Sequence, residues 1–306
     1  MGFWSTPIGR YLTSLNSGFS LGAGNTGTSS TGTIGVGYLA LSQATGGADC
    51  TAVGLRALRD MVDGVGSTAV GAWSQANNLI GGITSVGDSS LRDNQGTENN
   101  AFGYSCMIVN TTGQNNCAYG VFTLGTNLDG SYNTAYGNGA LRRNVSGAEN
   151  VAVGYRAAYE SLGNDQVAVG FESLRVATSG AGNTAVGSAA GWRTTTGSNN
   201  VFVGYNAGQN GSQAVDASNS IAIGYNAFTT KSNQAVIGNT SVVETVLRGA
   251  IVRNELGTDP PDPAEGSYVT WMSNGAGAGD DGDIMVKITA SGVTKTATLI
   301  DFSTLA

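Results

Sequence analysis

The sequence predicts an all-β fold, a parallel β-solenoid with coils of 16–17 residues. The first observation is a glycine that recurs at about this interval: Gly37, Gly54, Gly71, Gly87, Gly103, Gly120, Gly137, Gly154, Gly170, Gly187, Gly204, Gly224 and Gly238. The second is the residue before each glycine, which is always valine, isoleucine, phenylalanine or tyrosine and so favours a strand. The third is the interval itself, which is too short for a strand–helix–strand crossover of about 30 residues.

Positions within a coil are numbered from the recurring glycine, position 0. Alanine usually occupies position −2 and a small residue position +3, so we expect a thin interior. After the glycine we expect a second short strand, which often ends in a leucine at position +4. Another glycine, at position −7, lies in polar stretches such as TTGQNN, where we expect a turn with glycine at positive φ. One coil cannot bury its own apolar face, so successive coils should stack in register.

Two rows of large side chains exceed what so thin a coil can hold. Position −1 carries valine, isoleucine and aromatic residues throughout, and position +1 carries tyrosine in five coils: Tyr38, Tyr104, Tyr155, Tyr205 and Tyr225. Apolar surface of this extent marks a contact with another chain. We therefore expect the chain to associate with copies of itself, most simply about a three-fold axis.

The phrase x-A-V-G-Y/x-x-A, with its N-T-G-x-N turn, resembles the repeats of two groups of proteins over about residues 34–240. It is similar to the left-handed parallel β-roll in the heads of trimeric autotransporter adhesins. In its 16–17-residue period and N-T-A-V-G-Y wording it is more similar to the repeats of bacteriophage tail and head fibres. The resemblance implies a left-handed β-roll, a homotrimer and a structural, adhesive role.

The N-terminal sequence favours the phage fibre over the adhesin. An autotransporter needs a secretion signal and a membrane anchor, whereas MGFWSTPIGRYLTSLNSGFS has no positively charged segment followed by an apolar run. We therefore expect a tail fibre that is assembled in the host cytoplasm, located in the virion, and binds a glycan or protein of the host cell surface. Two alternatives stay open: an architectural head fibre or decoration protein without a receptor, and a tailspike-like polysaccharide depolymerase.

Composition argues against several other functions. With 21 acidic and 14 basic residues, a net charge of −7 and an isoelectric point near 4.5, we expect no nucleic-acid binding. Histidine, the commonest general base and metal ligand, is absent. No stretch approaches the ~20 apolar residues of a membrane span, and no motif predicts a cofactor or a metal. Cys50, Cys106 and Cys117 lack metal-ligand spacing and are interpreted as small core residues.

One pair of carboxylates has a spacing that could support catalysis. Glu149 and Asp165 both occupy position −5 in consecutive coils, which would place them roughly 5 Å apart, as in retaining glycosidases. Arginines on nearby turns, among them Arg142 and Arg156, favour a solvated row of charges instead. We therefore expect no enzymatic activity.

Residues 1–20 precede the repeats and are interpreted as an attachment segment. Thr6 and Pro7 are typical of a helix start, and Phe3, Trp4 and Tyr11 make the segment aromatic with little core of its own. The segment would cap the first coil, dock on other structural proteins of the virion, or do both.

The sequence changes character twice after the repeat shaft, residues 21–240. Residues 241–266 are interpreted as a neck, because three of the four prolines cluster in GTDPPDPAEG. Residues 267–306 contain three strand candidates, SYVTWMS, DIMVKIT and TKTATLIDF, which we expect to form a small β tip stabilised by its trimer mates. We expect Trp271, Asp280, Asp281 and Asp283 to contact the cell surface. Alternatively the tip only caps the trimer, or its acidic turn binds a cation.

Overall fold

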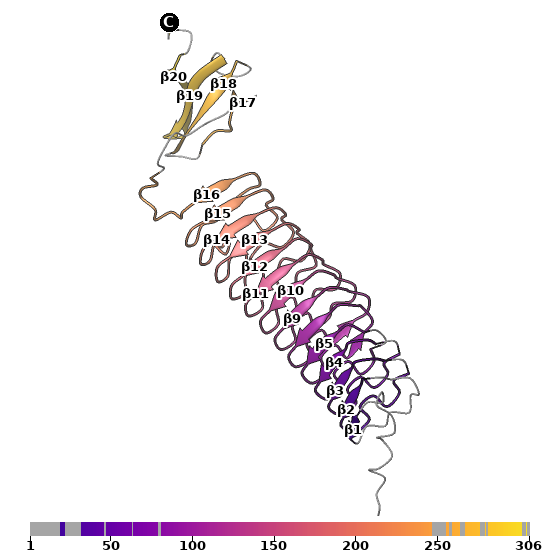
Figure 1. The fold of residues 1–306 in the computed structure, drawn as a ribbon. Helices are drawn as coiled ribbons and strands as arrows, with labels where there is room; N and C mark the ends of the chain where they lie inside the picture. The colour runs from indigo at the N-terminus through magenta and orange to yellow at the C-terminus, as the bar shows by residue number, and fades with distance from the viewer. Residues whose placement is uncertain are drawn as a thin grey trace, which may run out of the picture. The chain divides into compact units, whose positions relative to one another are not determined.

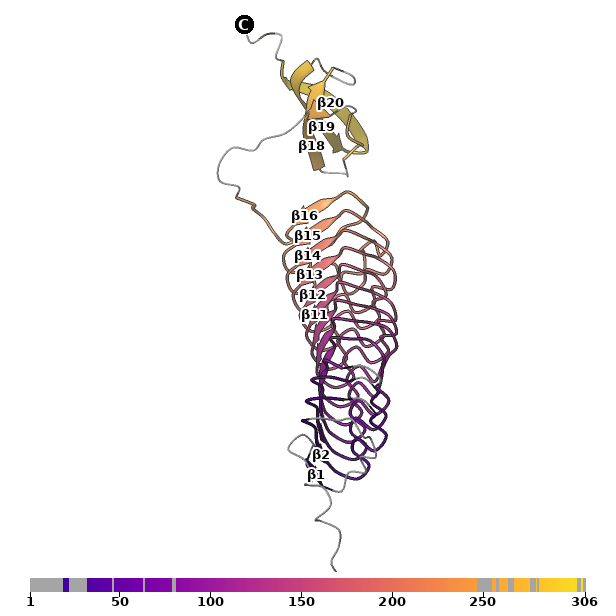
Figure 2. The ribbon, with the colours of Figure 1, turned by 45° about the vertical axis from the view of Figure 1, so that its right-hand side comes forward.

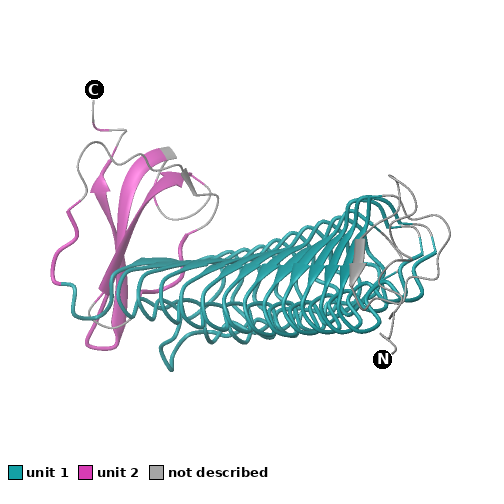
Figure 3. Ribbon diagram, turned by 60° about the horizontal axis from the view of Figure 1, so that its bottom comes forward, with its two compact units in different colours: residues 1–242 teal, residues 243–306 magenta. Residues whose placement is uncertain are grey.

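The computed structural model describes residues 19–21, 32–45, 47–62, 64–78, 81–246, 255–256, 259–263, 267–275, 279, 281–301 and 304. The chain divides into two compact units, residues 1–242 and 243–306, drawn in teal and magenta in Figure 3. The expected N-terminal helix and the aromatic residues Phe3, Trp4 and Tyr11 lie outside the described residues.

A parallel sheet of fourteen strands runs along one side of the first unit (Figures 1 and 2). Each strand pairs in register with the same three positions of the next coil, for example Ala135 with Ala152 and Tyr136 with Val153. The first unit is therefore a parallel β-solenoid, as the repeats predict. The strands are β1 (Phe19–Leu21), β2 (Ile34–Val36), β3 (Thr51–Val53), β4 (Thr68–Val70), β5 (Thr84–Val86), β7 (Asn100–Phe102), β9 (Cys117–Tyr119), β10 (Thr134–Tyr136), β11 (Val151–Val153), β12 (Val167–Val169), β13 (Thr184–Val186), β14 (Val201–Val203), β15 (Ile221–Ile223) and β16 (Ala235–Ile237).

The sheet begins one strand before the first coil that the glycine interval identifies. Phe19 pairs with Ile34, and Leu21 with Val36. The sequence carries the signal, since Ser20 fills the small −2 position and Gly22 follows Leu21, but the step from Gly22 to Gly37 is only 15 residues.

The second half of each coil differs from the expected second strand. After the glycine the chain makes consecutive turns, in which positions +2 and +4 have positive φ in most coils, for example 57° at Arg56 and 49° at Leu58. The amide of Arg56 still donates to the carbonyl of Tyr38 in the preceding coil, at 2.9 Å. Among the described residues a second strand pair forms locally, between β6 (Asp93–Asn94) and β8 (Val109–Asn110). The second-strand prediction is therefore wrong for most coils, because alternating positive φ values curl the backbone around a narrow interior.

Two rows of glycines allow neighbouring coils to approach each other. At position 0, Gly137 has a φ of 132°, and a Cβ there would lie 2.4 Å from the carbonyl oxygen of Gly154. At position −7 the expectation of a positive φ is wrong, and the requirement is contact alone: a Cβ on Gly130 would lie 2.4 Å from the carbonyl oxygen of Gly147. The positive φ of that turn falls at position −5, for example 60° at Glu149.

Small side chains line the interior, as predicted. The alanines at position −2 are buried: Ala52, Ala69, Ala101, Ala118, Ala135, Ala152, Ala168, Ala185 and Ala222. Phe202 occupies position −2 in one coil and is also fully buried. Glycines replace leucine at position +4 around it, and a Cβ on Gly208 would lie 2.4 Å from the Phe202 ring. A larger side chain at one interior position is thus compensated by a smaller one at another.

Buried asparagines form ladders through the same interior. The side-chain amide of Asn116 donates to Oδ1 of Asn99 at 3.1 Å, and that of Asn133 donates to Oδ1 of Asn116 at 3.0 Å. A second ladder, at position +7, contains Asn94, Asn110, Asn127 and Asn144. The ladders also bond to backbone carbonyls, so hydrogen bonds between coils hold the core together with apolar contacts.

The second unit is a sheet in the order β17 (Glu255–Leu256), β18 (Ser267–Asn274), β19 (Asp281–Ala290) and β20 (Val293–Ile300). Strands β18, β19 and β20 are antiparallel, which confirms the three strand candidates, and β17 pairs parallel with β18. Nζ of Lys287 donates to the carbonyl of Pro260 at 2.7 Å and pairs with Asp262 at 3.3 Å. Part of the proline-rich segment is therefore bound to this sheet.

Candidate binding surfaces

The outer face of the solenoid sheet carries many exposed apolar side chains along its length. Positions −3 and −1 point outward because position −2 between them is buried, and neither row contains a charged residue in the thirteen glycine-marked coils. We call these two rows, with the neighbouring row at position +1, the outer apolar surface. Its most exposed members are Ile34, Tyr38, Val53, Leu55, Val86, Tyr104, Tyr119, Val121, Tyr136, Val151, Val153, Tyr155, Phe171, Val186, Val203, Tyr205, Ile221, Ile223, Tyr225 and Ile237.

Aromatic rings on the outer apolar surface stack from coil to coil. The ring centres of Tyr119 and Tyr136 lie 4.8 Å apart with planes 7° from parallel, and those of Tyr205 and Tyr225 lie 5.8 Å apart. Tyr136 is nevertheless 55% exposed and Tyr225 58% exposed. Large, rigid side chains lose little conformational entropy when a partner covers them, so these rows suit a protein interface.

Two of the residues expected to contact a cell surface, Trp271 and Asp283, are buried in the C-terminal sheet. Trp271 and Asp283 are each 3% exposed, and the Lys287 ammonium lies 5.9 Å from the centre of the Trp271 ring. Asp281 begins β19 opposite Asn274, and Asp280 lies outside the described residues. The burial of Trp271 and Asp283 does not suit direct contact with a receptor.

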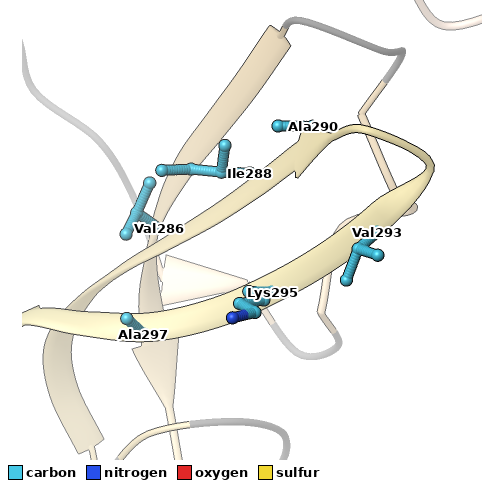
Figure 4. Close-up of a pocket in the computed structure, with 6 residues that line it drawn as sticks. All are labelled: Val286, Ile288, Ala290, Val293, Lys295 and Ala297. Atoms are coloured by element: carbon cyan, nitrogen blue, oxygen red, sulfur yellow. The ribbon is translucent and has the colours of Figure 1, made fainter.

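The other face of this sheet carries an apolar groove of about 500 Å³. Figure 4 shows its lining side chains on β19 and β20: Val286, Ile288, Ala290, Val293, Lys295 and Ala297. Ile288 is 48% exposed and Val293 54% exposed. An exposed apolar groove of this kind is typical of a contact surface, so the groove is a second candidate for contact between chains.

Glu149 and Asp165 are exposed and occupy equivalent positions in consecutive coils, where the amide of Asp165 donates to the carbonyl of Ala148. Within the described ranges, no group of three or more acidic or cysteine side chains could hold a metal ion. The same part of the chain contains no helix with the length and apolar character needed to cross a membrane.

The three cysteines differ in environment. Cys50 and Cys106 are buried, as expected, whereas Cys117 is exposed at position −3, so the core assignment is wrong for Cys117. The sequence register already places Cys117 in an outward row. Burial raises the pKa of the Cys106 thiol to about 12, because its thiolate would be poorly solvated.

No known family model, curated protein or solved structure matches the chain. The fold itself defines the class: a β-solenoid repeat protein with a parallel sheet along the solenoid and a small, mainly antiparallel sheet in its C-terminal unit.

Proposed function

We propose that the chain forms a homotrimeric, left-handed β-roll fibre of a bacteriophage virion, and that the fibre recognises the host surface. The outer apolar surface carries this proposal. It combines two rows without charge, along a sheet of fourteen strands, with tyrosines that are about half exposed. At ~4.8 Å per strand the surface extends over roughly 60 Å, and a soluble chain rarely leaves such a surface uncovered.

The number of chains, the handedness and the virion come from the resemblance to phage fibres and adhesin heads. The apolar groove of the C-terminal unit supports association independently, because copies of this sheet would cover one another's open faces. Three copies of a modest recognition site would raise overall avidity without one tight site. The aromatic residues Phe3, Trp4 and Tyr11 would join the fibre to other virion proteins.

The test of recognition compares the fluorescently labelled full-length chain with a chain that ends at Leu256. Both are incubated with a panel of bacterial strains, and the oligomeric state of each is checked first. We expect saturable binding of the full-length chain to some strains and its loss on truncation. Binding to none of the strains would favour an architectural fibre, and equal binding by both chains would place recognition outside the C-terminal unit.

A further inference from the structure

Arginine gathers on one flank of the solenoid, next to the +1 row of the outer apolar surface, where the guanidinium of Arg156 lies 5.0 Å from the centre of the Tyr155 ring. Eight of the fourteen basic residues occupy positions +2, +5 or +6: Arg56, Arg59, Arg92, Arg142, Arg143, Arg156, Arg175 and Arg193. Four acidic residues of the first unit share these positions: Asp60, Asp93, Glu160 and Glu172. We call this set the basic flank. It carries four net positive charges on a chain whose net charge is −7.

Aromatic rings hold several of these arginines in place. The guanidinium of Arg56 lies 4.3 Å from the centre of the Trp73 ring, and that of Arg142 lies 4.6 Å from the Phe122 ring. Arg142 also donates to the hydroxyl of Tyr159, at 3.3 Å. A guanidinium has five N–H donors, and these contacts leave most of them unused. The flank therefore presents donors whose orientation is largely fixed before a ligand arrives.

The basic flank is hollowed at a pocket of about 300 Å³, which three consecutive coils line with Arg59, Trp73, Asn77, Ser89, Arg92 and Asp93. Arg59 donates to Oδ1 of Asn77 at 2.7 Å, Asn77 donates to Asp93, and Arg92 donates to Asp93 at 2.7 Å. Arg59 is also paired with Asp60, and Arg92 with Asp93, so each guanidinium offers a ligand only the N–H groups outside its ion pair. The rest of the lining offers amide and hydroxyl groups for sugar hydroxyls, and an indole ring for the C–H face of a sugar.

We infer that the basic flank binds an acidic polysaccharide that runs along the coils, with one of its sugars in this pocket. The four consecutive coils of Gly137, Gly154, Gly170 and Gly187 each carry at least one of these arginines, and coils lie ~4.8 Å apart, which suits an extended polymer. Guanidinium groups pair well with carboxylates, and the remaining polar groups suit hydroxyls. The four carboxylates on the flank disfavour a ligand with a charge at every unit, so a nucleic acid is a poorer fit than a sparsely charged glycan.

This inference goes beyond the proposed function, because it assigns a ligand class to the solenoid itself. It depends neither on trimer formation nor on recognition by the C-terminal unit. Its failure would leave both of those proposals standing.

The test measures binding of the full-length chain to oligosaccharides of hyaluronan, which carries one carboxylate for every two sugars, by calorimetry at low salt. Dextran of similar length and single-stranded DNA serve as comparison ligands. We expect the carboxylated oligosaccharide to bind more tightly than either. The double variant Arg142→Gln with Arg156→Gln should weaken this binding about tenfold or more, because each guanidinium contributes a charge-assisted hydrogen bond.

The matched control removes two positive charges elsewhere, by Lys231→Gln with Lys295→Gln, and should change the affinity less than about twofold. Unfolding curves confirm that both double variants fold. If the two double variants weaken oligosaccharide binding equally, the effect is explained by net charge alone and the inference is overturned. Tighter binding of DNA than of the oligosaccharide, or no binding of the oligosaccharide, would overturn it as well.

Discussion

Individual positions in the coil are governed by how closely the next coil approaches. Glycine at position 0 meets two requirements, a positive φ and the absence of a Cβ, whereas glycine at position −7 meets only the second. Both rows are visible in the sequence as regular glycines. The sequence does not show why the two rows require glycine for different reasons. Turn-forming polar residues surround the −7 glycines and suggest that these glycines are needed for a positive φ.

Three glycine-to-alanine variants separate these reasons. Gly137→Ala introduces a clash at a φ of 132°, Gly130→Ala introduces a clash alone, and a Cβ on Gly211 would meet no atom within 4 Å. We expect Gly211→Ala to leave the denaturation midpoint unchanged or slightly raised. Gly130→Ala should destabilise each chain by about 1–3 kcal/mol, and Gly137→Ala by roughly 1–2 kcal/mol more. Equal midpoints for Gly137→Ala and Gly211→Ala in urea unfolding would contradict the coil register.

The burial of Cys106 should make the free energy of unfolding depend on pH. Burial raises the pKa of its thiol from 9.0 to about 12, so the unfolded thiol ionises at lower pH than the folded one. The stability from the neutral thiol is present below about pH 9 and is lost as the pH rises toward about 12. Between about pH 9 and 10.5 the free energy of unfolding should fall faster than in Cys106→Ala, by up to ~1.4 kcal/mol per pH unit. Parallel pH profiles for the two proteins would contradict this.

Among the elements, the strand of each coil can be predicted from sequence, and the turns after it cannot. Alanine between two larger residues shows the outward–inward–outward alternation directly. The turns place leucine at positive φ, such as 47° at Leu174, although this conformation costs roughly 1–2 kcal/mol and leucine gives no turn signal. Burial of the leucine side chain offsets that cost. In the expected second strand, the side chain at position +5 would lie on the opposite face from those at positions +2 and +6. The turns bring these three positions to one flank instead, so the sequence pattern does not predict the basic flank.

Removing one side chain from the asparagine ladder should lower the stability of the chain strongly. Asn133 donates to Asn116 and to the carbonyl of Gly147, and its own Oδ1 accepts from Asn150. Asn133→Ala would leave several buried polar groups unpaired, at about 1–3 kcal/mol each. We expect a clear fall in melting temperature, whereas Ser146→Ala, at an exposed position outside the outer apolar surface, should have little effect. A similar melting temperature for both variants would show that the ladder contributes little.

For the whole molecule, the sequence predicts more apolar surface than one chain can bury. It does not predict which faces are buried within the chain and which stay exposed. Trp271 and Ile288 both lie in strands with two distinct faces. Lys287 binds Pro260 on the Trp271 side, so that side is buried and the groove on the Ile288 side stays open. The two-residue alternation of a strand shows which side chains share a face of the sheet, but it does not show which face is covered. Turn position and residue type predict that Trp271 and Asp283 are exposed, but neither feature reports their burial.

Association through the outer apolar surface predicts different effects for two exposed tyrosines. Tyr136 lies on that surface at 55% exposure, and Tyr132 lies at position −5, off that surface, at 62% exposure. Tyr136→Glu would place a charge in a desolvated interface and should weaken association strongly. Tyr132→Glu should leave it unchanged. Equal association of the two variants would show that the outer apolar surface is not the interface.

Sedimentation equilibrium of the full-length chain at micromolar concentration tests the central claim most directly. The outer apolar surface and the open groove of the C-terminal unit predict one species with the mass of three 30.8 kDa chains, which loses its fold when it dissociates. A stable, folded monomer of 30.8 kDa at that concentration would contradict the account.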